Sequence, residues 1–288
     1  MSSRIDATFE RLRARGERAL VVYLMAGDPS LADTERLVVE AERRGADVVE
    51  LGVPFSDPLA DGPVIQRAGV RGLAAGTSMA RVLEMVGGLR ARVRVPLVLM
   101  THYNPVLAFG LAAFAPTAAR AGVDGMIVPD LPHEESAPLR AEAEPAGLDL
   151  IHLVAPTSPP ARVKAIARRS RGFVYVVSLT GVTGERRELP RDLDAQIRTL
   201  RLVTTKPVCV GFGVSTPEQV ATVGRIADGV IVGSAIVRAI EQHAGTAALV
   251  DKVGEFIGTL KAPLRHPSAE PATARRPTAG VTGFRESH

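Results

Sequence analysis

The sequence predicts a parallel (β/α)8 barrel, and two observations support this prediction. Eight short segments, each four to seven residues long and almost wholly apolar, alternate along the chain with segments of helical periodicity. Continuous apolar runs are typical of strands that are buried on both faces of a parallel sheet. Alternating strands and helices indicate right-handed βαβ units, and eight of them in roughly 240 residues fit a closed barrel. A doubly wound open sheet is the alternative, which would need more strands than usual and a ligand crevice where the strand order reverses.

The expected elements follow one another in a regular order. An extra N-terminal helix is expected at residues 4–15, where Ile5, Phe9 and Leu12 share one face. The strands are expected at residues 19–25, 47–51, 96–100, 124–128, 149–154, 173–178, 207–210 and 229–232. The later helices are expected at residues 31–44, 78–92, 111–121, 134–146, 159–168, 191–201, 216–223 and 246–260.

These elements predict a single barrel domain over residues 1–261 and a disordered tail over residues 262–288. The tail has scattered Pro, Arg, Ser and Thr and few large apolar side chains, so it could bury little surface.

The composition fits a cytoplasmic protein with an aliphatic core. Hydrophobic residues make up 46% of the 288 residues, and aromatic residues only 4%. The net charge of +4 indicates no nucleic-acid surface, because no basic run is interleaved with aromatic residues. The single cysteine, Cys209, cannot form an intrachain disulfide, which fits a reducing compartment, and we expect it to be a buried small residue. No apolar run is long enough for a membrane span, and no signal peptide is evident.

Carboxyl groups follow the second expected strand, where a barrel places its active site. Glu50 lies in this otherwise apolar strand, and residues 52–63 contain three prolines, two glycines, Asp57 and Asp61. Two carboxyl groups in a partly apolar pocket tend to separate in pKa, so that one can give a proton and the other take one. We expect Glu50 and Asp61 to be this pair, although a lone acid at a strand end can also form a structural salt bridge. Asp57 is a weaker candidate, with a helix cap or loop hydrogen bond as the alternative.

Glycine-containing turns follow the last three expected strands, at residues 181–184, 211–213 and 233. Glycine lets backbone N–H groups approach a ligand, and the start of a helix favours an anion. Because barrels commonly bind phosphate at the loops after the seventh and eighth strands, we expect a phosphate site there. The alternative is that the glycines only form turns. The six histidines show no zinc-ligand spacing, and there is no cysteine cluster, so we expect no metal.

The stretch Glu50–Pro63, ELGVPFSDPLADGP, resembles the signature of the tryptophan synthase alpha chain family. The agreement extends over roughly residues 4–260 and includes the segments GDP at 27–29, YNP at 103–105, VPDLP at 128–132, GVTG at 181–184, GFGVS at 211–215 and GSAIV at 233–237. The resemblance implies a carbon–carbon lyase of tryptophan biosynthesis. Such a lyase cleaves indole-3-glycerol phosphate to indole and glyceraldehyde 3-phosphate in a retro-aldol reaction.

The resemblance also implies roles for individual residues. Glu50 would be the acid and base, and Asp61 would accept the indole N–H and stabilise the charge that develops there. The remaining implied site residues are Gly184, Gly213, Gly233 and Ser234 at the phosphate, Tyr23 and Tyr175 at the pocket wall, and Thr183 as a partner of Asp61 when the loop closes. For Tyr23, packing in the core is the alternative.

The family works with a beta chain, so the resemblance implies an alpha2–beta2 complex. Pyridoxal phosphate would be held by the beta chain alone, and this chain would carry no cofactor. The loop at 54–63 and the loop after Gly181 would lie near the partner, which makes Asp57 an interface candidate. His102 stands where the family often has a tyrosine, and Leu179 where some members have an arginine.

Two other functions fit parts of the pattern. A sugar-phosphate isomerase or synthase barrel would keep Gly213, Gly233 and Ser234 but would not require the Glu50–Asp61 pair. A barrel that only binds and activates a partner would need neither acid, and the presence of both argues against it.

Overall fold

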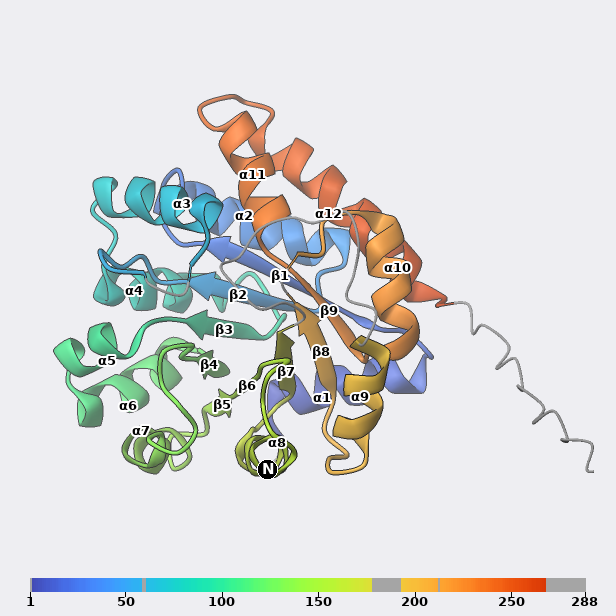
Figure 1. The fold of residues 1–288 in the computed structure, drawn as a ribbon. Coiled ribbons are helices and arrows are strands. Elements are labelled where there is room, and N and C mark those ends of the chain that lie inside the picture. Colours follow the sequence, from blue (N-terminus) through green and yellow to red (C-terminus); the bar gives the residue numbers. More distant parts are fainter. Residues whose placement is uncertain (1, 59–60, 178–192, 212, 268–288) are drawn as a thin grey trace, which may run out of the picture.

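Nine parallel strands curve into a barrel in the computed structural model, which describes residues 2–58, 61–177, 193–211 and 213–267 (Figure 1). The strands are β1 (Ala19–Met25), β2 (Val48–Gly52), β3 (Leu97–Met100), β4 (Gly125–Ile127), β5 (Asp149–Ile151), β6 (Leu153–Val154), β7 (Val174–Val177), β8 (Val208–Gly211) and β9 (Gly229–Val232). Their order in the sheet is β5-β4-β3-β2-β1-β9-β8-β7-β6. Because only His152 separates β5 from β6, the two ends of the sheet are joined by the chain itself. The predicted barrel is therefore confirmed, with the fifth expected strand divided in two, and the open sheet is excluded.

Helices surround the sheet on the outside (Figure 1). They are α1 (Arg4–Ala14), α2 (Leu31–Arg44), α3 (Pro63–Ala74), α4 (Met79–Leu89), α5 (Tyr103–Phe109), α6 (Leu111–Ala121), α7 (Ala137–Ala143), α8 (Pro160–Arg169), α9 (Leu193–Arg201), α10 (Pro217–Ile226), α11 (Ser234–His243) and α12 (Leu249–Arg265). Helices α3, α5 and α11 were not expected from the sequence. Helix α5 is only 7 residues long, too short to show a clear helical period. None of the three begins with a side-chain cap, but α6 and α8 lack one too and were predicted.

The strand residues divide into two layers, as the alternation of side chains along a strand requires. Val21, Val48 and Val98 point into the barrel, whereas Val22, Val49 and Leu99 pack under the helices. Helix α1 covers the N-terminal end of the barrel, because its Ile5, Phe9 and Leu12 join the inner layer. Cys209 belongs to the same layer and is 0% exposed, as predicted. The C-terminal end of the barrel is not covered by α1, and a functional site can lie there.

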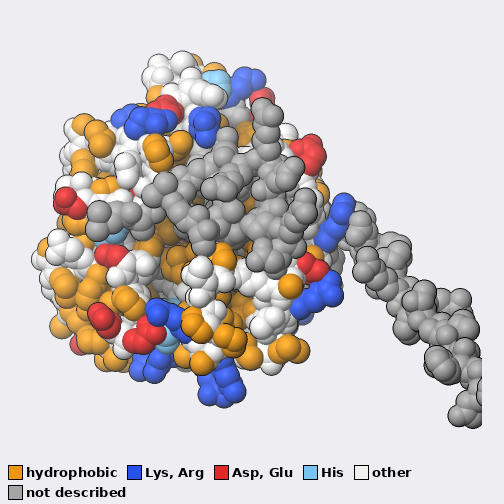
Figure 2. Space-filling view, in the orientation of Figure 1, with side chains coloured by type: hydrophobic (Ala, Val, Ile, Leu, Met, Phe, Trp, Pro, Cys, Tyr) orange, Lys and Arg blue, Asp and Glu red, His pale blue; other side chains and the backbone are white. Residues whose placement is uncertain are grey.

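Basic and acidic side chains are mixed on the face shown in Figure 2. Among the side chains coloured there, Lys and Arg form separate groups with Asp and Glu between them. This face therefore gives no support for a nucleic-acid surface. No helix within the described ranges is long and apolar enough to cross a membrane.

Helix α12 continues past residue 261, where the domain was expected to end, and extends to Arg265. Leu264 is 0% exposed, and its carbonyl accepts a hydrogen bond of 2.9 Å from the backbone N–H of Arg18. This packing holds the last turn in place although Pro263, which cannot donate a backbone hydrogen bond, lies within it. The predicted tail therefore begins after the helix, and residues 268–288 lie outside the described residues.

A buried ion pair fastens α12 to the barrel. Lys261, which is 3% exposed, donates to Asp47 Oδ2 at 2.8 Å and to the carbonyl of Arg18 at 2.9 Å. Burial raises the pKa of Asp47, and the Lys261 ammonium group opposes that shift. The pair thus joins the loop before β2 to the last helix.

Replacing Lys261 by Met should lower the free energy of unfolding by about 3–5 kcal/mol, because Asp47 would be left buried without its cation. Urea unfolding followed by circular dichroism measures this loss. Lys252→Met is the matched control on the same helix, since Lys252 pairs with Glu255 at an exposed position. Equal stability of the two variants would contradict the anchoring role of Lys261.

Candidate functional site

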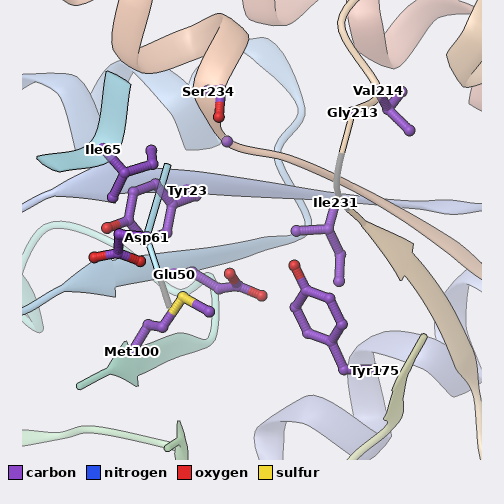
Figure 3. Close-up of a pocket in the computed structure, with 11 residues that line it drawn as sticks. Tyr23, Glu50, Asp61, Ile65, Met100, Tyr175, Gly213, Val214, Ile231 and Ser234 are labelled. Carbon is purple, nitrogen blue, oxygen red and sulfur yellow. The ribbon is translucent and has the colours of Figure 1, made fainter. Parts of the chain in front are cut away.

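A pocket opens at the C-terminal end of the strands, where the sequence predicts the site (Figure 3). The space that it encloses is about 530 Å³, part of which is open to solvent. The pocket is lined by Tyr23, Glu50, Asp61, Ile65, Met100, Tyr175, Gly213, Val214, Ile231, Gly233 and Ser234. Seven of these eleven residues were site candidates from the sequence, so the structure brings the predicted residues together.

Glu50 is placed in the pocket by the alternation along β2. Val48 points into the barrel, and Glu50, two residues later, points the same way. The side chain is 1% exposed, and Oε1 has no hydrogen-bond partner among the described residues. Burial raises the pKa of Glu50 to about 8, so the carboxyl group is protonated at neutral pH. A buried, protonated carboxyl group can act as a general acid.

Asp61 reaches the pocket from the segment that precedes α3. Its backbone N–H donates to the carbonyl of Pro58 at 3.1 Å, and its carbonyl accepts from Gln66 Nε2 at 2.9 Å. Burial raises the pKa of the Asp61 carboxyl, and the nearby His102 opposes the shift. Figure 3 shows Asp61 and Tyr23 on one side of the Glu50 carboxyl and Tyr175 on the other. The two acids therefore share one pocket but have different surroundings.

Two tyrosines complete the wall around Glu50. A Cβ atom at Gly52 would lie 2.1 Å from the Tyr23 hydroxyl, and one at Gly211 would lie 2.4 Å from the Tyr175 hydroxyl. Glycine at the ends of β2 and β8 therefore makes room for both phenol groups. Burial raises the pKa of each phenol well above its usual value, which keeps both protonated. Tyr23 also packs in a hydrophobic cluster, so it serves the core as well as the pocket.

The start of α11 forms the part of the pocket where a phosphate is expected. Ser234 is the first residue of this helix, and Gly233 precedes it without a side-chain cap. The first N–H groups of a helix have no intrahelical partner, and the dipole of the helix favours an anion at this end. Gly213 lies nearby in the pocket wall with φ of 87°, a conformation that favours glycine. Thr183, Gly184 and Leu179, the other residues singled out in this region, lie outside the described residues.

Asp57 and His102 lie outside the pocket wall. Asp57 is exposed and accepts a hydrogen bond from the Ser56 hydroxyl. His102 is 7% exposed, and its ring lies 5.1 Å from the ring of Phe55. The described residues contain no group of three or more His, Cys, Asp or Glu side chains that could hold a metal ion.

Four apolar pocket residues were not predicted as site residues. Met100 and Ile231 belong to β3 and β9, where the inward positions could have been identified from the alternation. Ile65 lies on α3, a helix that was not predicted, and Val214 lies in a loop. For these two residues the sequence contains no local signal.

Comparisons with known proteins agree over nearly the whole chain. The model of the family described as tryptophan synthase alpha chain matches residues 9–265. Proteins named tryptophan synthase alpha chain are 51% identical over 259 residues in Citrifermentans bemidjiense, covering 90% of this chain and 97% of that protein, and 50% identical over 259 residues in Geobacter sulfurreducens, covering 90% and 98%. The crystal structure of the tryptophan synthase alpha subunit from Legionella pneumophila has a TM-score of 0.84 and 36% identity, covering 92% of this chain and 99% of that chain. A chain of Mycobacterium tuberculosis tryptophan synthase has a TM-score of 0.85 and 37% identity, with coverage of 92% and 99%. This chain therefore belongs to the tryptophan synthase alpha chain family.

Proposed function

We propose that Glu50 and Asp61 are the catalytic residues with which this chain cleaves indole-3-glycerol phosphate. As a member of its family, the chain is a lyase of tryptophan biosynthesis, and it functions there as the alpha subunit. The observation that supports the residue assignment is the buried Glu50, whose pKa is raised to about 8, beside Asp61 in a pocket with a helix start at its rim. The isomerase alternative loses its basis, because it does not need this pair of acids.

The reaction begins with a proton transfer from Glu50. The protonated carboxyl group gives its proton to C3 of the indole ring, which becomes a cationic indolenine. Asp61 accepts a hydrogen bond from the ring N–H and stabilises the positive charge that develops there. The Glu50 carboxylate then removes the proton of the 3′-hydroxyl group as the carbon–carbon bond breaks. The bonding electrons return to the ring, indole and glyceraldehyde 3-phosphate are released, and Glu50 is protonated again.

The substrate phosphate would be bound by backbone N–H groups rather than by cationic side chains. Gly213, Gly233 and Ser234 line the pocket, and none of them is basic. A helix start and glycine turns suit a phosphate because their N–H groups can all point to one anion. Gly184 would add to this site, and Thr183 would hydrogen-bond Asp61 when the loop closes over the substrate.

The family name implies a beta-chain partner, and we infer an alpha2–beta2 complex. Pyridoxal phosphate would be held by the beta chain, and this chain would need no cofactor of its own. The exposed Asp57 would lie at the partner interface, in the loop between β2 and α3. A cytoplasmic location stays a prediction, supported by the single, buried cysteine.

Replacing the acids singly tests the assignment. Glu50→Gln and Asp61→Asn should each lower the rate of indole release by about 10²–10⁴-fold, because each removes a group that acts on a transition state. The assay uses purified protein and indole-3-glycerol phosphate, with and without a beta chain. Release at the wild-type rate by either folded variant would remove that residue from the mechanism.

The pH dependence tests which form of Glu50 begins the reaction. Since the pKa of Glu50 is raised to about 8, kcat/KM should fall by about tenfold per pH unit above that value as the acid is lost. Initial rates between about pH 7 and pH 9.5 measure this, with circular dichroism to show that the fold persists. A rate that rises through pH 8 would instead mean that the carboxylate form is the active one.

A carboxylate at the start of α11 should weaken substrate binding. Ser234→Asp should raise KM by about tenfold or more with kcat little changed, because it repels the phosphate in ground state and transition state alike. The helix should tolerate the change, since Asp is favourable in a first turn. Ser78→Asp, at the exposed start of α4, is the control with the same charge and should leave KM unchanged. Equal KM values for the two variants would place the phosphate elsewhere.

A further inference from the structure

Four charged side chains connect three elements that carry pocket residues. We name Asp28, Arg67, Arg71 and Glu241 the Arg71 cluster. Arg71 Nε and Nη2 donate to the two carboxylate oxygens of Asp28 at 2.7 and 2.8 Å, and its Nη1 donates to Glu241 Oε1 at 2.8 Å. Arg67 binds both oxygens of Glu241 at 2.9 Å. Arg71 thus bridges two carboxylates, one in the turn after β1 and one on α11.

Within the Arg71 cluster, Asp28 is buried, whereas Arg71 and Glu241 are partly exposed. The side chain of Asp28 is 1% exposed, whereas those of Arg71 and Glu241 are 29% and 30% exposed. A bidentate arginine–carboxylate contact fixes orientation as well as distance, and burial protects it from screening by salt. The hydrogen bonds from Arg67 lower the pKa of Glu241 to about 2, with Arg71 contributing, so this carboxyl group stays charged at neutral pH. The contacts are therefore present under physiological conditions.

Each element in the cluster also contributes to the pocket. Helix α3 carries Arg67 and Arg71, begins two residues after Asp61 and places Ile65 in the pocket wall. Helix α11 carries Glu241 and begins with Ser234 at the opposite end. Strand β1 carries Tyr23 and leads into Asp28.

The same three elements share a hydrophobic cluster and pack closely together. The cluster consists of Tyr23, Met25, Val64, Ile65, Ala68 and Val237. Helix α3 is pressed against the turn after β1, because a Cβ atom at Gly72 would lie 2.8 Å from the carbonyl oxygen of Ala26. A substitution in the Arg71 cluster is therefore expected to shift α3, α11 and the turn after β1 relative to one another.

We propose that Arg71 is a positioning residue for the cleavage reaction, which holds Asp61 at a fixed place relative to the phosphate end of the pocket. The proposal rests on the proposed function, in which Asp61 stabilises the ring cation and the start of α11 binds the phosphate. One substrate must meet both groups, yet α3 and α11 are joined across 170 positions of sequence by the Arg71–Glu241 contact. Side-chain contacts must therefore set their spacing, and a displacement of about 1 Å can cost as much as 10²-fold in rate.

Glu241→Gln and Arg71→Lys test the proposal. Glu241→Gln removes the charge on α11 and leaves the buried Asp28–Arg71 pair intact, so it should fold. Arg71→Lys keeps the charge but cannot bridge two carboxylates with the geometry of a guanidinium group. Per folded molecule, both variants should lower kcat by roughly 10- to 100-fold and change KM by less than about threefold, because the phosphate contacts remain. Glu35→Gln is the matched control, since it breaks an inter-element ion pair with Arg92 at 3.3 Å that is remote from the pocket residues.

The double variant Asp61→Asn/Glu241→Gln separates positioning from general loss of folding. If the Arg71 cluster acts through Asp61, kcat should fall no further than in Asp61→Asn alone, measured as indole release at high enzyme concentration. If Glu241→Gln only reduced the amount of folded protein, it would lower the rate of indole release by the same factor in the wild-type chain and in Asp61→Asn. Wild-type kcat in both Glu241→Gln and Arg71→Lys, or an equal loss in both backgrounds, would overturn the proposal. Indole release at the wild-type rate by Asp61→Asn would instead overturn the proposed function.

Discussion

The burial of the Glu50 carboxyl group is the constraint on which the rest of the site depends. The inward neighbours of Glu50 are Val48 along the strand and Val98 and Tyr23 across from it on the two adjoining strands, so little polar surface surrounds it. Removal of water from the carboxyl group raises its pKa to about 8, so the folded protein holds a proton that the unfolded chain loses near the usual glutamate pKa of 4.5. Stability contributed by this group therefore falls as the pH rises through that window. The proposed catalytic acid therefore lowers the stability of the fold at higher pH, and the burial of the large core offsets this loss.

The remainder of the barrel isolates this group and brings its partners to it. Helix α1 covers the far end, and the pocket lies at the C-terminal ends of the strands. The close packing of α3 on the turn after β1 holds the segment that contains Asp61 over the opening. The N-terminus of helix α11 faces the same pocket, since Gly233 and Ser234 line it. The proposed acid, charge stabiliser and anion site therefore come from three separate parts of the barrel.

Local sequence patterns predicted much of this arrangement, and some of the parts that they missed have physical reasons. The position of Glu50 in an otherwise apolar strand made it a candidate for the pocket, with a structural salt bridge as the alternative. The structure decides between them, because Glu50 points the same way as the inward Val48. Helices α3 and α11 were missed, and the missing side-chain cap does not explain this, because α6 and α8 lack one as well and were predicted. The end of α12 was missed because Pro263 usually ends a helix, whereas here the burial of Leu264 outweighs it. The contact between Arg71 and Asp28 spans 43 positions, and no periodicity within one segment can reveal it.

The buried carboxyl groups of this chain show how structural and chemical roles can be told apart. Asp28 is held by a bidentate arginine, and Asp47 by a buried lysine. In both cases the cation offsets the loss of hydration, and the contact fastens one element to another. Glu50 is as deeply buried as Asp28, but within the described part of the chain it has no cationic partner, and desolvation is the cause of its raised pKa. A carboxyl group in such surroundings stays neutral and keeps a proton that it can give away. Because no cationic side chain of the described residues pairs with it, Glu50 does not fasten one element to another, but it is suited to act as a general acid.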